Sequence, residues 1–298
     1  MKTLIRIMSL LLIGMISSLT VNAQEYQRSH FPDRTPGWYT LGLNGGFAYQ
    51  TSDVKSTLNG YGLGLTLAKN YYYQPGSPIS FDLRGRLLYS ETIGLNTKRS
   101  TGIEFNDALN GSRLLDYTTE NGGLGYVIPN YKTTHAEAGL EAVLTANRLR
   151  ENTGIILSAF GGINLDWYNT KIDQANSNGT YDYTLIDDIN DSNSSIKSIL
   201  RNNILDGRYE TNAHGFEDSG KIKFMPSIGL ELGYQFTPRF SMHLNHKATF
   251  AGTDDIDGQL WDNNNNPTST NDVHHYTCLL YTSPSPRDAT LSRMPSSA

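Results

Sequence analysis

The segment Lys221–Phe236, KIKFMPSIGLELGYQF, alternates apolar and polar side chains over almost its whole length. Successive side chains of a β-strand point to opposite faces, so this alternation predicts a strand with one apolar face and one small or polar face. The apolar face comprises Ile222, Phe224, Ile228, Leu230, Leu232, Tyr234 and Phe236, and the other comprises Lys223, Ser227, Gly229, Glu231, Gly233 and Gln235. The segment therefore predicts an all-β chain whose strands have two chemically different faces.

Six further segments show the same alternation, at about 38–49, 61–69, 79–89, 134–146, 155–168 and 240–250. An eighth strand is expected to begin near Val273, but its alternation fades, so we predict that the last strand is damaged or truncated. The connections after the second, fourth and sixth strands are short, whereas those after the third, fifth and seventh are long. Short turns at one end and long loops at the other are typical of an antiparallel transmembrane β-barrel.

The N-terminus has the features of a secretory signal peptide, which favours a location outside the cytoplasm. Lys2 and Arg6 precede a short apolar core, and residues 21–23, Val-Asn-Ala, end in the small side chains that a signal peptidase requires. We therefore predict a cleaved signal peptide over 1–23, followed by a periplasmic lead-in over 24–36. No later segment approaches about 18 consecutive apolar residues, so helical membrane anchoring is not expected.

The composition agrees with a barrel and excludes other classes. Only 18% of the residues are charged, while the 28 glycines suit turns and small interior positions and the 18 tyrosines suit a membrane interface. The net charge of −5 argues against nucleic-acid binding, which requires a basic surface. Cys278 is the sole cysteine, so neither an internal disulfide nor a cysteine-based metal site is possible.

Seven visible strands and a damaged eighth fit a barrel of about eight strands, which must close because the bilayer offers no water to unpaired backbone groups. At this point the chain resembles the porin-like, OmpA-type outer-membrane β-barrel family over about 37–277, through its strand pattern rather than through any invariant motif. The resemblance implies a bacterial outer-membrane location. OmpA-type proteins often continue into a periplasmic peptidoglycan-binding domain, and nothing after Thr277 matches one.

The tail from Cys278 onward reads CLLYTSPSPRDATLSRMPSSA and is rich in Ser and Pro. Proline cannot occupy the middle of a paired strand, so the tail is not expected to belong to the sheet. It also resembles translated adapter or vector sequence. We therefore interpret 278–298 as a non-native tail that follows a barrel domain over 37–277.

Four charged residues are expected to point into the lumen. Arg84 and Arg86 lie on the polar face of the third strand, and Glu137 and Glu141 lie on that of the fourth. An eight-stranded barrel is just wide enough to be filled by side chains, and buried charges must be paired. The main hypothesis is thus an ion-pair plug, and the alternative is a selective conduction path.

The long connections are acidic. Residues 171–220 contain nine acidic and four basic side chains, and residues 251–272 contain five acidic and no basic ones. Asp255, Asp257 and Asp262 offer oxygen atoms that could bind Ca²⁺, but they lack the spacing and terminal glutamate of an EF-hand loop. Solvated loop charge is the alternative interpretation, and a further one is that these carboxylates share divalent cations with lipopolysaccharide.

The predicted function is a structural or surface-interaction role through acidic extracellular loops that we expect to be mobile, with outer-membrane lipid, lipopolysaccharide and an extracellular ligand as partners and no cofactor. A small-solute channel is one alternative. An enzyme at the lumen mouth, using His135 or His214, is another, but no nucleophile and base occur at a recognisable spacing, so no catalytic activity is expected. A soluble lipocalin-like barrel is the last alternative, and it would turn its apolar faces inward.

Overall fold

The computed structural model describes residues 38–52, 54, 56–101, 117–119, 122–176, 179–186, 193–237, 240–259 and 271–284. The predicted signal peptide, the lead-in and Asp262 lie outside these ranges, as do residues 285–298. Within them, eight long strands form one antiparallel sheet that closes on itself through β4 and β5. These strands are β1 (Tyr39–Thr51), β2 (Ser56–Tyr72), β3 (Ile79–Leu95), β4 (Asn130–Ala146), β5 (Ile155–Ile172), β9 (Lys221–Thr237), β10 (Phe240–Phe250) and β11 (Val273–Pro284).

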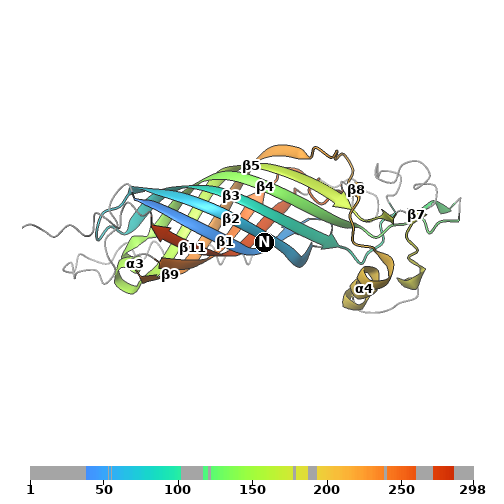
Figure 1. Cartoon of the computed structure of the whole chain (residues 1–298), viewed down its shortest axis with the longest axis horizontal. Helices are drawn as coiled ribbons and strands as arrows, with labels where there is room; N and C mark the ends of the chain where they lie inside the picture. The colour runs from blue at the N-terminus through green and yellow to red at the C-terminus, as the bar shows by residue number, and fades with distance from the viewer. Residues whose placement is uncertain are drawn as a thin grey trace, which may run out of the picture.

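Neighbours in the barrel are neighbours in sequence, except that β1 also pairs with β11 to close the sheet. Figure 1 shows the strands as an elongated, tilted barrel with α3 (Asn147–Thr153) at one end and the long connections at the other. Because short turns are periplasmic in such barrels, the end with α3 is assigned to the periplasm and the other to the cell exterior. Among the described residues, no helix is long and apolar enough to cross a membrane.

The two faces of the sheet are the reverse of those in a soluble barrel. Large apolar side chains from all eight strands are exposed on the outside, including Leu41, Leu65, Leu87, Leu140, Ile163, Leu230, Leu244 and Leu279. The lumen instead buries polar and charged side chains. This arrangement contradicts the lipocalin-like alternative, because its apolar wall faces outward, where only lipid can cover it.

Glycines make room inside the barrel. A side chain at Gly229 would collide with the ring of Phe160, and one at Gly62 would collide with the ring of Tyr276. Both rings point into the lumen, where Tyr276 is fully buried. The abundance of glycine in the sequence is therefore partly explained by large lumen side chains that need small partners on facing strands.

The last strand corrects the sequence prediction. β11 is complete, and residues 278–284 continue the antiparallel ladder with β1, ending at the Thr40–Pro284 pair. The prediction failed because outward His275 and Thr277 interrupt the apolar face. Pro284 is tolerated because it is the final residue of the strand, where a missing N–H breaks no inner ladder bond. The described barrel thus extends past Thr277.

Five other elements differ from expectation. Residues 147–153, which lie in the short connection predicted after the fourth strand, form the helix α3, which ends at Gly154 in the left-handed conformation with φ of 76°. Four strands, β2 to β5, extend beyond their predicted outer ends. The extensions of β3, β4 and β5 stand above the apolar layer and mix polar side chains with Leu95, Tyr131 and Ile172, which pack into apolar clusters at the outer end.

The long connections contain short elements rather than uniform loops. They are β6 (Ala175–Asn176), β7 (Gly179–Thr180), η5 (Thr184–Ile186), α4 (Asn193–Ile199), the π-helical turn η6 (Leu200–Ile204) and β8 (Thr211–Asn212). α4 and β7 lie beyond the outer end of the barrel in Figure 1. β8 pairs with the outer end of β5 and so attaches the second long connection to the barrel wall.

Candidate functional site

An ion-pair layer crosses the middle of the lumen. We define it as Arg84, Arg86, Glu137, Glu141, Glu231 and Lys247, whose side chains are at most 5% exposed. Arg84 Nε contacts Glu141 Oε2 at 2.7 Å, and its other end pairs with Glu231. Arg86 Nε lies 2.9 Å from Glu141 Oε1. One carboxylate on β4 therefore holds two guanidinium groups from the adjacent strand.

The two guanidinium groups are also packed against an aromatic face. The guanidinium carbons of Arg84 and Arg86 lie 4.7 and 5.4 Å from the ring centroid of Phe160. Phe160 projects from β5, the strand on the far side of β4, so the layer spans three neighbouring strands before it reaches Glu231 on β9. A cation over an aromatic face gains electrostatic stabilisation in a desolvated site.

Lys247 provides the second half of the layer. It projects from β10, pairs with Glu137 and lies 3.6 Å from Glu141. Its ammonium also donates to Asn164 Oδ1 at 2.9 Å. Three buried carboxylates are thus matched by three buried cations, as burial of charges requires.

The structure brings three of the four predicted lumen residues directly together: Arg84, Arg86 and Glu141. Glu137 is in the same layer but is paired with Lys247 rather than with an arginine. Sequence reasoning missed Glu231 and Lys247 as partners, although their positions on the polar faces of their strands were available as a signal. The sequence does not show which of these charged side chains contact one another across the lumen.

A second polar group lies nearer the extracellular mouth. His135 Nδ1 is 2.8 Å from Asp166 Oδ2, and its ring stacks on that of His274 with centroids 4.4 Å apart. His274 Nε2 in turn lies 3.3 Å from Ser90 Oγ. The Ser90 hydroxyl therefore lies beside the His274 imidazole, a contact that was not predicted from the sequence. Ser90 is fully buried, however, so no substrate can reach its hydroxyl in this structure.

The third long connection covers this group. Ile256 is completely buried, and its carbonyl accepts hydrogen bonds from the hydroxyls of Thr133 at 2.7 Å and Thr170 at 2.6 Å. Its N–H donates to Asp272 Oδ2 at 2.9 Å. Ile256 belongs to a mouth cluster made of Val54, Tyr131, Tyr168, Ile172, Ala213, Phe216, Met225, Ala251 and Ile256. The segment therefore closes the outer end of the lumen.

The described calcium candidates have other contacts. Asp255 pairs with Lys221 at 2.6 Å and accepts a hydrogen bond from Thr253. Asp257 accepts the backbone N–H groups of Val54 and Gln259 at 3.0 Å each. Asp262 lies outside the described residues. Two of the three carboxylates therefore hold the covering segment in place, and calcium binding here stays a prediction.

Asp272 is the most perturbed acid of this region. It lies just before β11, is 1% exposed, and has its pKa raised to about 9 by burial and by the charges of Asp257 and Asp254. A buried carboxyl beside two other carboxylates favours its neutral form. The closed arrangement of the mouth therefore favours the protonated form of Asp272.

The periplasmic end is closed by α3. Glu151 accepts hydrogen bonds from the hydroxyl of Tyr73 at 2.6 Å and from the N–H of Gly76 at 3.1 Å. Arg150 donates to Gln235 Oε1 at 3.0 Å, and both helix residues are buried. The helix thus ties the β2–β3 turn to β9 across the opening. Between this closure and the ion-pair layer the lumen keeps a cavity of only about 50 Å³, bordered by Asp82, Arg84 and His243 among others.

Beyond the barrel, the first two long connections pack into a head with its own apolar core. This loop cluster comprises Leu95, Tyr117, Tyr126, Val127, Ile128, Tyr181, Tyr183, Ile186 and Leu200. Tyr183 lies at its centre, within 6.5 Å of the ring centroids of Tyr117, Tyr126 and Tyr181. Burial among these side chains raises the pKa of Tyr183 well above its usual value. The described parts of these connections are therefore packed against one another, and the mobility that we expected of the loops stays a prediction.

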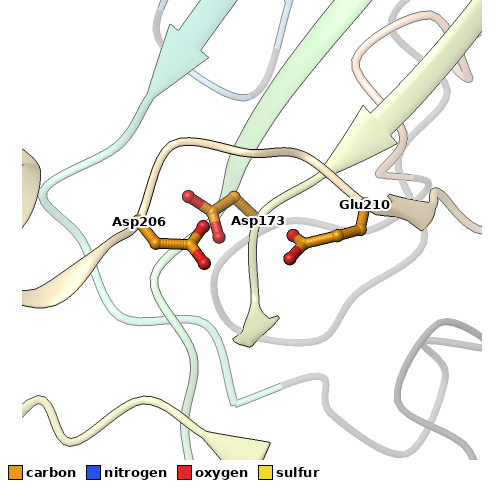
Figure 2. Close-up of side chains that lie close together, drawn as sticks. All are labelled: Asp173, Asp206 and Glu210. Carbon is orange, nitrogen blue, oxygen red and sulfur yellow. The ribbon is translucent and has the colours of Figure 1, made fainter. Parts of the chain in front are cut away.

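Three carboxylates converge beside this head. Figure 2 shows Asp173, Asp206 and Glu210 pointing toward one another, with oxygen atoms within 4.8 Å of each other. Asp173 is buried and accepts hydrogen bonds from the Tyr181 hydroxyl at 2.6 Å and the Gly207 N–H at 2.8 Å. Burial raises the pKa of Asp173. Because its oxygens already join the two ends of the second long connection, the cluster has a structural explanation.

No family model and no curated protein matches the chain. Among solved structures, similar folds include Neisserial surface protein A (TM-score 0.39, 9% identity, covering 82% of this chain and 96% of that one). The attachment invasion locus protein Ail of Yersinia pestis gives 0.37 and 11%, with 84% and 99% covered. The outer membrane enzyme PagL gives 0.33 and 10%, with 83% and 99% covered. The closed sheet, its lipid-facing wall and its polar lumen make this chain an outer-membrane β-barrel protein.

Proposed function

We propose that this protein is a sealed membrane anchor that presents a folded head at the cell surface for interaction with an extracellular ligand. The observation that carries the proposal is the loop cluster, in which residues from two separate connections bury a shared tyrosine-rich core outside the barrel. Ordering these two connections costs conformational entropy, which the burial of their shared apolar core offsets. Rigid display of a binding surface is a function that explains it.

The lumen supports this proposal against the channel alternative. Charged side chains fill its middle, Ile256 closes its outer end and α3 closes its inner end. Each charged group of this layer is paired with one of opposite sign, as a closed interior requires. We also infer that the protein has no catalytic activity, since Ser90 and Ser241, the serines whose hydroxyls lie beside imidazoles among the described residues, are both buried.

The test compares the full protein with a variant whose head is removed. In the variant, residues 97–127 and 174–210 are each replaced by a short Gly-Ser turn, which leaves the ion-pair layer and the mouth cluster untouched. Both proteins, in lipid nanodiscs, are applied to an array of glycans and extracellular matrix proteins. We expect binding that only the full protein shows. Equal binding by both proteins, or none by either, would overturn the proposal.

A further inference from the structure

The lipid-facing wall is hollowed where β3 and β4 meet. Gly85, Ala136 and Ala138 point outward there, in a belt whose exposed side chains are mostly large and apolar. Leu65 and Leu87 border this hollow on one side, and Ile163 and Leu165 border it on the other. We call the depression the outer groove. It lies at the depth of the bilayer, so hydrocarbon must fill it, and it is wide enough to cross several strands.

The extracellular end of the outer groove is aromatic. Tyr89 and Trp167 border it there, and the Trp167 indole N–H donates to Ser219 O at 2.8 Å, which fixes the ring. Tyrosine and tryptophan concentrate at the level where acyl chains meet headgroups. Lipid headgroups in the outer leaflet therefore lie just above this pair of rings.

Two lysines stand at that headgroup level. Lys132 on β4 and Lys171 on β5 are direct cross-strand partners on the outer face. Their side chains are 35% and 39% exposed. Like charges placed directly opposite each other destabilise a sheet unless an anion lies between them. Lys132 has Glu91 at 3.0 Å, but the carboxylate beside Lys171 among the described residues is that of the 89% exposed Asp218 at 3.7 Å, a weak surface contact.

We propose that the outer groove and the Lys132–Lys171 pair together bind lipopolysaccharide, with acyl chains in the groove and a lipid phosphate between the two ammonium groups. The charge of the pair is complementary to a phosphate, and each ammonium has three donors, of which one carboxylate uses only part. The width of the groove favours a lipid with several chains over one with two. The site supplies the proposed surface protein with a fixed contact to the outer leaflet, and it rests on the membrane orientation assumed for that function.

The experiment titrates lipid A into the detergent-solubilised full chain and measures bound lipid by native mass spectrometry. The double variant Lys132→Gln with Lys171→Gln should bind about 25-fold more weakly, because each lysine near a lipid phosphate contributes about fivefold. A second variant, Ala138→Phe, fills the groove and leaves the lysines intact, and it should also weaken binding. The matched control Lys98→Gln removes an exposed lysine of the first long connection and should bind as the wild type does.

Folding of each variant is verified by its faster migration on a gel before heating. Unchanged affinity in the double variant, or an equal loss in Lys98→Gln, would overturn the proposal. Equally tight binding of two-chain phosphatidylglycerol would overturn the assignment to lipopolysaccharide. The head-deleted variant separates this inference from the proposed function, because it should lose ligand binding on the array and still bind lipid A.

Discussion

At the scale of single residues, Glu141 is the carboxylate on which three lumen cations converge: Arg84, Arg86 and Lys247. Replacing it by glutamine removes the charge while keeping the size, and leaves three buried cations with too few negative charges beside them. We expect Glu141→Gln to lower the free energy of unfolding by about 3–5 kcal/mol. Urea unfolding in phospholipid vesicles, followed by tryptophan fluorescence, measures it.

Glu217→Gln is the matched control, since Glu217 is exposed and should change stability by less than about 0.5 kcal/mol. If Glu141→Gln were as harmless as this control, the contacts of Glu141 would not be what holds the lumen together.

The raised pKa of Asp272 leads us to expect that the free energy of unfolding depends on pH. Its pKa, raised to about 9 by burial and by Asp257 and Asp254, means that the folded protein holds a proton that the unfolded chain releases near pH 4. Rising pH therefore favours the unfolded state across the window from about pH 4 to about pH 9. Asp272→Asn keeps an acceptor for the Ile256 N–H but cannot ionise. Its unfolding free energy should fall less steeply between pH 5 and 9 than that of the wild type.

Denaturant titrations of the wild type and of Asp272→Asn at each pH measure how steeply the free energy of unfolding of each protein changes with pH. Identical slopes in the two proteins would mean that Asp272 does not carry the extra proton.

Only some of the contacts in the ion-pair layer could be predicted from the sequence. Arg84 and Glu141 could be matched because adjacent antiparallel strands place inward residues side by side. Glu231 and Lys247 were also recognisable as inward, but their contacts cross the lumen from β9 and β10. Such contacts depend on the tilt and stagger of the closed barrel, which alternation along one strand does not encode.

At the scale of elements, β11 decides whether the barrel can close. Its residues 278–284 pair with β1 on one side, and residues 278–282 pair with β10 on the other. A chain ending at Thr277 would leave both neighbours with unpaired backbone groups at membrane depth, each costing several kcal/mol. We expect it not to show the faster unheated migration of a folded barrel. A chain ending at Pro284 should fold like the full protein.

Gel migration before and after heating, in lipid vesicles, compares the three lengths. Folding of the chain that ends at Thr277 would show that seven strands and a fragment suffice.

The elements were predictable where one face touches lipid. β10 has the predicted bounds, 240–250, because it crosses little more than the apolar layer and alternates throughout. β11 was misjudged because His275 and Thr277 are outward and polar. The loop cluster was missed for a related reason. Its apolar residues are scattered over two connections, and neither connection has a regular spacing of apolar residues that would predict their contact.

At the scale of the whole molecule, the lumen is closed at three levels that do not depend on one another. α3 seals the periplasmic end, the ion-pair layer fills the middle and Ile256 caps the outer end. Even if one closure opened, the other two would block ions, and an eight-stranded barrel has no spare width beside its side chains. We therefore expect no discrete conductance steps in planar bilayers at neutral pH. Ile256→Ala, which loosens only the cap, should also be silent, because the layer of Arg84, Arg86 and Lys247 remains below it. Conductance steps in the wild type would mean that the three closures open together. Conductance steps in Ile256→Ala but not in the wild type would mean that Ile256 alone blocks the passage of ions.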